Sequence, residues 1–249
     1  MQDASKIAVR SALENRLNRM TILVGMVGSD GIILAADQCR HADPQSENEI
    51  YDRMGSPKIT HLPKHSVAYA VAGDDLTDRL GMELSAVLDS KGLDDPSSIE
   101  SLLCSLQAAA DAKLQAEFPG RSWPDCRRSL LILFYGTPEP QLWSLKLNMG
   151  FPSAKRVSGM AIGGATANSA RFFECYFQAN KPIKKLLPLA SHIVLTAGRL
   201  DPLTIDGLDV ALLNDGVYRL LNESEKDRLR ERSRRLDLLI RQQLFEGDL

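Results

Sequence analysis

Two short apolar runs joined by a tight-turn signal constrain the fold of this chain more than any other feature. Ile22 to Val27 and Ile32 to Ala36 have the length and composition of buried strands, and Ser29-Asp30-Gly31 lies between them. Asp-Gly is a dipeptide that tight hairpin turns favour. The pattern predicts an antiparallel hairpin. Thr21, just before the first strand, and Asp37, just after the second, are therefore expected to be neighbours.

Blocks of strands and helices follow along the rest of the chain. The sequence predicts strands over 58–62 and 66–72, a helix over 75–88, and a second helix from a capping box at Ser97 to the breaker Pro119-Gly120. Strands over 130–135, 141–147 and 157–162 precede helices over 165–178 and 185–196. A hairpin of 208–213 and 217–221 and a charged helix over 224–245 follow. This order fits two packed sheets with helices on both sides, an α+β fold.

The overall charge indicates neither nucleic acid nor membranes as partners. The chain carries 30 Lys and Arg against 32 Asp and Glu, a net charge of -2, so no basic field attracts a polyanion. No apolar run has the length of a membrane span, and the first residues lack the continuous apolar core of a secretory signal. We therefore expect one domain with no nucleic-acid partner and no membrane attachment.

The cysteines and histidines do not favour a metal site. The four cysteines lie far apart and form no CxxC pair; they are Cys39, Cys104, Cys126 and Cys175. Such spacing favours reduced thiols, which indicates a cytoplasmic protein. His61 and His65 are four residues apart, but Pro63 between them disfavours the helix that would align them. We expect no metal ion.

Thr21, Asp37 and Lys58 carry the groups that an N-terminal nucleophile requires. A threonine hydroxyl is a weak nucleophile until a base takes its proton, and a free α-amine, which titrates at about 7.7–8.0, is such a base on the same residue. A nearby lysine lowers the pKa of that amine by like-charge repulsion, and a carboxylate keeps the lysine charged and positioned. These three residues can fill the three roles once the chain is cut before Thr21.

The same part of the chain resembles the β-type proteasome subunits, which are N-terminal-nucleophile (Ntn) hydrolases. The resemblance covers nearly all of residues 21–221 and is carried by Thr21, Gly25, Asp30-Gly31, Ala35-Ala36-Asp37, Lys58-Ile59 and Val71-Ala72-Gly73-Asp74. It implies a four-layer αββα Ntn-hydrolase sandwich over residues 21–249, with a C-terminal helix. It also implies a threonine endopeptidase that needs no cofactor.

The resemblance gives each matching residue a role. Thr21 is the nucleophile, its amine is the general base, and Asp37 and Lys58 tune them. The backbone N–H of Gly73 stabilises the oxyanion, and a side chain there would obstruct the substrate. Two further residues, Asp201 and Thr204, resemble the family's second acidic and hydroxyl pair beside the amine; threonine replaces the more usual serine at 204.

Two positions depart from the family pattern. The segment between Asp37 and Lys58 is longer than usual, so Arg53 lies nearer the usual spacing of the lysine. Arginine is permanently charged and Arg53 lacks the strand that follows Lys58, which favours Lys58. In Gly163-Gly164-Ala165, Gly164 stands where the family has a serine that contacts the amine, so one hydrogen bond is expected to be absent.

The resemblance also implies a substrate pocket near Val71 and Asp75, with Arg40 and His41 close by. An acidic pocket at Asp75 would favour basic side chains of the substrate. The alternative is that Asp75 only caps its helix and complements the helix dipole.

Residues 1–20 must be removed before Thr21 has a free amine. Either this extension is a prosegment that cleaves itself, or translation begins at Met20, which an aminopeptidase then trims. If neither happens, the chain is a catalytically silent ring subunit. An Ntn amidase or acyltransferase that acts on a small amide is a third alternative, although such relatives often begin with cysteine or serine.

The resemblance also implies an assembly. Stacked homo-oligomeric rings of the bacterial HslV kind would enclose the active sites, so that unfolded polypeptides are the substrates, and an ATP-dependent unfoldase is a candidate partner. The C-terminal helix, rich in Arg and Glu, is either a solvated face or a ring contact.

Overall fold

The computed structural model describes residues 21–38, 58–73, 75–90, 96–117, 129–137, 139–146, 154–164, 170–202 and 205–245. The N-terminal extension over 1–20 lies outside these residues.

Ten strands in these ranges form two five-stranded antiparallel sheets. The first sheet has the strand order β10-β9-β2-β1-β8 and the second the order β3-β4-β5-β6-β7. The strands of the first sheet are β1 (Leu23–Val27), β2 (Gly31–Ala36), β8 (Met160–Gly163), β9 (Asp209–Asn214) and β10 (Val217–Leu220). Those of the second are β3 (Ile59–Leu62), β4 (Val67–Ala72), β5 (Ser129–Phe134), β6 (Gln141–Lys146) and β7 (Ala154–Val157).

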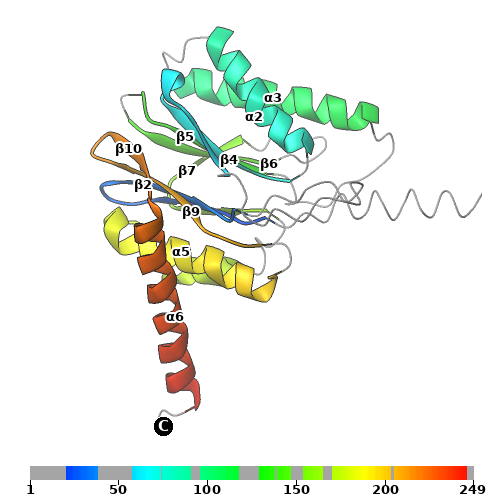
Figure 1. Cartoon of the computed structure of the whole chain (residues 1–249). Coiled ribbons are helices and arrows are strands. Elements are labelled where there is room, and N and C mark those ends of the chain that lie inside the picture. The colour runs from blue at the N-terminus through cyan, green and yellow to red at the C-terminus, as the bar shows by residue number, and fades with distance from the viewer. Residues whose placement is uncertain are drawn as a thin grey trace, which may run out of the picture.

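Helices cover both sheets, which confirms the mixed α+β class. The helices are α2 (Asp75–Ser90), α3 (Pro96–Glu117), α5 (Ile183–Leu200) and α6 (Glu223–Phe245), with short 3-10 turns η1 (Pro63–His65) and η2 (Arg171–Tyr176). Figure 1 shows α2 and α3 together on one side of the molecule and α5 on the other, with the strands between them. The C-terminal helix α6 crosses α5 and extends away from the sheets (Figure 1).

Alternation along β4 shows how the layers are held together. Val67, Tyr69 and Val71 pack against α2 and α3, because a strand turns successive side chains to opposite faces. Ala70 and Ala72 face the first sheet instead, beside Leu23 and Leu34. The helix-facing side therefore carries large side chains, and the side between the sheets carries small ones.

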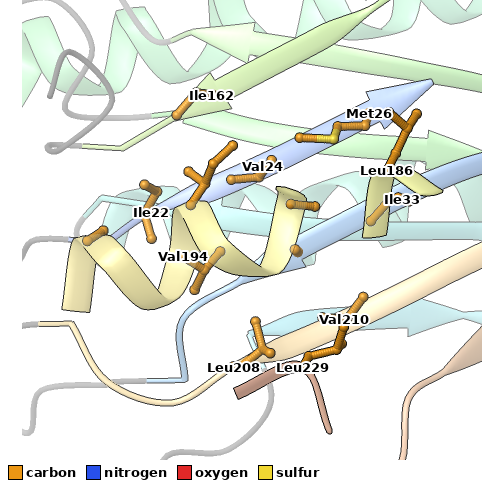
Figure 2. Packing of buried hydrophobic residues seen from close by; sticks show 14 of the residues in the cluster. Ile22, Val24, Met26, Ile33, Ile162, Leu186, Val194, Leu208, Val210 and Leu229 are labelled. Carbon is orange, nitrogen blue, oxygen red and sulfur yellow. The ribbon is translucent and has the colours of Figure 1, made fainter. Parts of the chain in front are cut away.

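The first sheet buries its other face against α5. Ile22, Val24 and Met26 alternate along β1 and pack on Val194 and other apolar residues of α5, as Figure 2 shows. Leu229 of α6 joins this cluster (Figure 2). Alternation along β1 thus directs one set of side chains to α5 and the other to the second sheet.

The hairpin predicted from the first apolar runs is confirmed. β1 and β2 pair antiparallel, with Val27 opposite Ile32 and Leu23 opposite Ala36. The turn also contacts α5: Oδ1 of Asp30 accepts the backbone N–H of Ile183 at 2.7 Å. Ile183 is the first residue of α5, where such N–H groups have no partner within the helix. The turn therefore also fixes the helix that covers its sheet.

One predicted strand and the second half of one predicted helix were wrong. The strand expected over 157–162 is two strands, β7 and β8, which belong to different sheets. Ser158-Gly159 separates them, and the carbonyl of Gly159 accepts the N–H of Val27, which directs the chain into the first sheet. Of the helix expected over 165–178, residues 165–169 lie outside the described ranges. Residues 171–176 form a 3-10 helix that buries only Phe173, and so small an apolar face does not favour an α-helix there.

No helix within the described ranges combines the length and the apolar character that crossing a membrane requires.

Candidate active site

Lys58 lies between Thr21 and Asp37. Its Nζ donates hydrogen bonds to Oγ1 of Thr21 at 2.7 Å and to Oδ2 of Asp37 at 2.6 Å. All three residues are buried, with 5%, 0% and 5% of Thr21, Asp37 and Lys58 exposed. The structure thus brings together three of the residues singled out in the sequence, in the order hydroxyl, ammonium and carboxylate.

The hairpin places Asp37 opposite the start of β1. Oδ1 of Asp37 accepts the N–H of Ile22 at 3.0 Å, and the N–H of Asp37 donates to the carbonyl of Ile22 at 3.4 Å. Both carboxylate oxygens are therefore engaged, one by the backbone next to Thr21 and one by Lys58. This leaves the carboxylate little freedom to rotate away.

Lys58 reaches the site from the other sheet. It directly precedes β3, whereas Thr21 and Asp37 border β1 and β2. A buried ammonium is costly unless it is paired, and Asp37 supplies the opposite charge. The alternative cation, Arg53, lies outside the described residues, so Lys58 is the cation that the structure places on the Thr21 hydroxyl.

Gly164 packs directly against Thr21. A Cβ at this position would lie 1.9 Å from the carbonyl oxygen of Thr21, and the φ of Gly164 is +99°. A serine here, as in the family pattern, would therefore need a different backbone. The chain comes so close to Thr21 at this point that only glycine fits.

Ser129 is a residue of this region that sequence reasoning missed. Its Oγ accepts the N–H of Gly164 at 3.0 Å, and its side chain is buried. A Cβ at Gly163 would lie 2.5 Å from the same oxygen. Ser129 is the first residue of β5, and its neighbours in sequence carry no sign of this contact. It places a hydroxyl beside Gly164.

Gly73 follows β4 close to this cluster. Its φ is +148°, which L side chains rarely adopt. The preceding residue, Ala72, has its Cβ 3.4 Å from the position of a Cβ at Gly164, so the end of β4 lies next to the chain that touches Thr21. The role of its N–H as an oxyanion donor stays a prediction.

Asp201 caps the C-terminal end of α5. Its N–H donates to the carbonyl of Ala197 at 2.9 Å, and its carbonyl accepts the N–H of Ile205 at 3.0 Å. The chain then passes Gln38, whose N–H donates to the carbonyl of Asp206 at 2.7 Å. The loop that contains Asp201 therefore returns beside the end of β2. Thr204 lies outside the described residues.

The residues expected to bind substrate are only partly described. Val71 is buried in the cluster between β4 and the helices α2 and α3. Asp75 is the first residue of α2, a position where a carboxylate complements the helix dipole, but its side chain is outside the described part. Arg40 and His41 are outside it as well, so the pocket stays a prediction.

His61 contacts two tyrosine side chains. His61 shares a hydrogen bond of 2.5 Å with Oη of Tyr135, and its ring stacks on Tyr218. Desolvation lowers the pKa of His61. Cys104 and Cys175 are free thiols. No group of three or more His, Cys, Asp or Glu side chains suited to a metal ion occurs among the residues that the structure describes.

Comparison with known proteins adds no assignment: no protein-family model matches the chain, and a search of curated proteins also finds no match.

Proposed function

We propose that this protein is a threonine-type endopeptidase with the four-layer αββα Ntn-hydrolase fold, in which Thr21 is the nucleophile. The observation that supports this most is the contact of Lys58 Nζ with both Thr21 Oγ1, at 2.7 Å, and Asp37 Oδ2, at 2.6 Å. A threonine that merely belonged to a strand would not need a buried, carboxylate-paired ammonium on its hydroxyl.

The charges suit the chemistry of an N-terminal threonine. A buried cation next to the α-amine disfavours the ammonium form of that amine, which keeps it a base at neutral pH. The same cation stabilises negative charge that develops on Oγ1. Because Asp37 pairs with Lys58, the site does not carry an isolated buried charge.

The proposed reaction has two steps. In the first, Oγ1 of Thr21 attacks the peptide carbonyl carbon while its proton passes to the α-amine, and the N–H of Gly73 stabilises the oxyanion. The C–N bond then breaks, the leaving amine takes the proton, and an ester on Thr21 remains. In the second, water attacks this ester with the amine as base, which releases the carboxylic acid product and restores the hydroxyl.

Processing decides whether this chemistry occurs. In the full-length chain the nitrogen of Thr21 belongs to an amide bond with Met20 and is not basic. Self-cleavage after Met20, or a start at Met20 followed by aminopeptidase removal of that methionine, would turn it into an amine. Without this step the protein would be a silent ring subunit on the same fold. An Ntn amidase stays a weaker candidate, because the paired lysine and aspartate are typical of the peptidases.

The proposed assembly is a cytoplasmic, homo-oligomeric stack of rings with an enclosed chamber for unfolded polypeptides. An ATP-dependent unfoldase is its proposed partner. The distal half of α6 supports a contact between copies over a purely solvated face, because it exposes six large apolar side chains. These are Leu236, Leu238, Leu239, Ile240, Leu244 and Phe245.

Hydrolysis of unstructured peptides by the purified full-length gene product tests the proposal. Intact mass and N-terminal sequencing establish whether the assembled chain begins at Thr21. We expect Thr21→Ala to lose hydrolysis and Thr21→Ser, which retains a hydroxyl, to keep part of it. Thr137→Ala is the matched control, since the Thr137 hydroxyl donates to the nearby carbonyl of Glu139 at an exposed position.

The outcomes separate the candidates. A chain that begins at Thr21 and loses hydrolysis only with Thr21→Ala supports the peptidase. A chain that keeps Met20 in the assembled particle and shows no hydrolysis supports the silent subunit. Equal hydrolysis by the wild type and Thr21→Ala would exclude Thr21 as the nucleophile.

A further inference from the structure

A second buried carboxylate, Asp209, lies at the junction of the two sheets. Asp209 is the first residue of β9 and pairs with Ala36, the residue before Asp37. It has only 2% of its surface exposed. Neither the hairpin nor the resemblance assigns a role to this residue.

The carboxylate of Asp209 holds the backbone next to Lys58. Its Oδ2 accepts the N–H of Ile59 at 3.2 Å, although 150 positions separate the two residues in the chain. Ile59 directly follows Lys58 and begins β3. Since β9 belongs to the first sheet and β3 to the second, this hydrogen bond joins the two sheets where Lys58 enters the site.

A lysine of the C-terminal helix balances the charge of Asp209. Nζ of Lys226 lies 3.5 Å from Oδ1 of Asp209 and 2.9 Å from Oε1 of Glu223. Lys226 is 6% exposed, so its stem and ammonium are inside the protein although α6 is a surface helix. A buried carboxylate without such a partner is costly, and Lys226 therefore pairs with Asp209 and holds it in place.

We infer that Asp209 is a positioning residue for Lys58 and that Lys226 of α6 holds Asp209 in position. The inference rests on the proposed function of Lys58. Lys58 must keep Nζ within hydrogen-bonding distance of two atoms at once, and the hydrogen bond from the Ile59 N–H to Asp209 fixes the backbone directly after it. A shift of about 1 Å in such a group costs about a hundredfold in rate.

The inference links the C-terminal helix to the site. Asp37 holds the ammonium end of Lys58 through Oδ2, and Asp209 holds the backbone end through Ile59. The two carboxylates come from neighbouring strands, β2 and β9. Movement of the first turn of α6 would reach Lys58 through only two contacts, Lys226 to Asp209 and Asp209 to Ile59.

Two double variants of the full-length protein isolate this role. Asp209→Asn with Lys226→Met removes both charges but keeps an oxygen that accepts the Ile59 N–H. Asp209→Ala with Lys226→Met removes both charges and that acceptor. We expect the alanine pair to have a kcat about tenfold to a hundredfold lower than the asparagine pair, with the same KM, because Asp209 orients Lys58 and does not bind substrate.

Hydrogen exchange of the peptide over residues 58–62 gives a readout that needs no catalysis. Exchange there is expected to be faster in the alanine pair than in the asparagine pair, with β10 and α6 unchanged. Glu231→Gln is the matched control on α6, because Glu231 pairs with Arg235 on the surface. It is expected to match the wild type in both measurements.

The inference would be overturned if residues 58–62 exchanged at the same rate in the alanine pair and the asparagine pair. It would also be overturned if exchange differed between the two pairs but their kcat values were the same. Faster exchange throughout β9, β10 and α6 would show a purely structural role and also overturn it. If the wild type has no hydrolysis that depends on Thr21, the proposed function fails. The exchange comparison then still decides whether Asp209 fixes the Lys58 segment.

Discussion

Asp37 and Lys58 form a buried ion pair in which 2.6 Å separates Oδ2 of the carboxylate from Nζ of the ammonium. Asp37 comes from the end of β2 and Lys58 from the start of β3, so the pair joins the two sheets. Thr21 adds a hydroxyl to the same ammonium. The pair is therefore a structural contact as well as the proposed means of activating Thr21.

Removing the lysine alone should destabilise the protein. Lys58→Met leaves Asp37 buried without its counter-ion, which typically costs about 3–5 kcal/mol in the free energy of unfolding. Denaturant unfolding of the variant measures this cost. Lys64→Met is the control, since Lys64 pairs with Asp89 at the exposed surface and such pairs contribute little. Equal effects of the two substitutions would contradict the buried pair.

Gly164→Ala tests the close approach to Thr21. Any L residue with φ near +99° costs about 1–2 kcal/mol, and the Cβ would in addition overlap the Thr21 carbonyl oxygen. Gly216→Ala is the matched control, because Gly216 has φ +74° with no atom within 4 Å of the added carbon. We expect Gly164→Ala to lose clearly more unfolding free energy than the control, and to lose peptide hydrolysis. Equal losses of stability would mean that Thr21 has room to move.

Local sequence signals predicted the hairpin and brought Thr21 and Asp37 together. Turn chemistry at Asp30-Gly31 and two apolar runs fix the register, and the register fixes which residues meet. The position of Lys58 needed the resemblance as well, because the segment after Asp37 has no periodic pattern that fixes its path. The resemblance therefore predicted that Lys58 contacts Thr21 and Asp37, which the spacing of the residues alone does not predict.

Contacts between distant segments were not predictable from the sequence. Ser129 and Gly164 are 35 positions apart, and Ile59 and Asp209 are 150 apart. Each contact is made by the first residue of a strand, Ser129 of β5 or Asp209 of β9. Both residue types are frequent, and the neighbouring sequence contains no pattern that marks these two positions. The division of 157–162 between two sheets was missed for a similar reason: only the partner strands reveal that the chain changes sheets at Gly159.

Acidification should destabilise the fold through His192. Its ring is buried beside Ser233, Asp237 and Arg199, and desolvation lowers its pKa despite the opposing effect of Asp237. A histidine in the unfolded chain has a pKa of about 6.5. Just below that pH the unfolded state therefore binds more protons than the folded state. The contribution of His192 to the free energy of unfolding is therefore fully present above about pH 6.5. It is lost as the pH falls towards the lower pKa of His192 in the folded protein.

Thermal or denaturant unfolding between about pH 5 and pH 8 measures this dependence. His192→Gln should flatten it, because glutamine does not titrate. His65→Gln is a control, since His65 lies beside the exposed carboxylate of Asp89. An unchanged pH dependence in His192→Gln would show that other groups cause the acid instability.

Two serines near the junction of α5 and α6 should respond in opposite ways to replacement by alanine. Oγ of Ser191 is buried and has no hydrogen-bond partner among the residues that the structure describes. Oγ of Ser233 is hydrogen-bonded to Nδ1 of His192 at 2.8 Å and accepts contacts from Arg199 at 3.4 Å. Ser191→Ala should leave the unfolding free energy unchanged or raise it by up to about 1 kcal/mol, because it removes a desolvated hydroxyl.

Ser233→Ala should lower the unfolding free energy by about 1–3 kcal/mol, because His192 and Arg199 lose a partner. Denaturant unfolding of both variants measures the difference, and a larger loss for Ser191→Ala than for Ser233→Ala would show that Ser191 has a partner in the remaining chain.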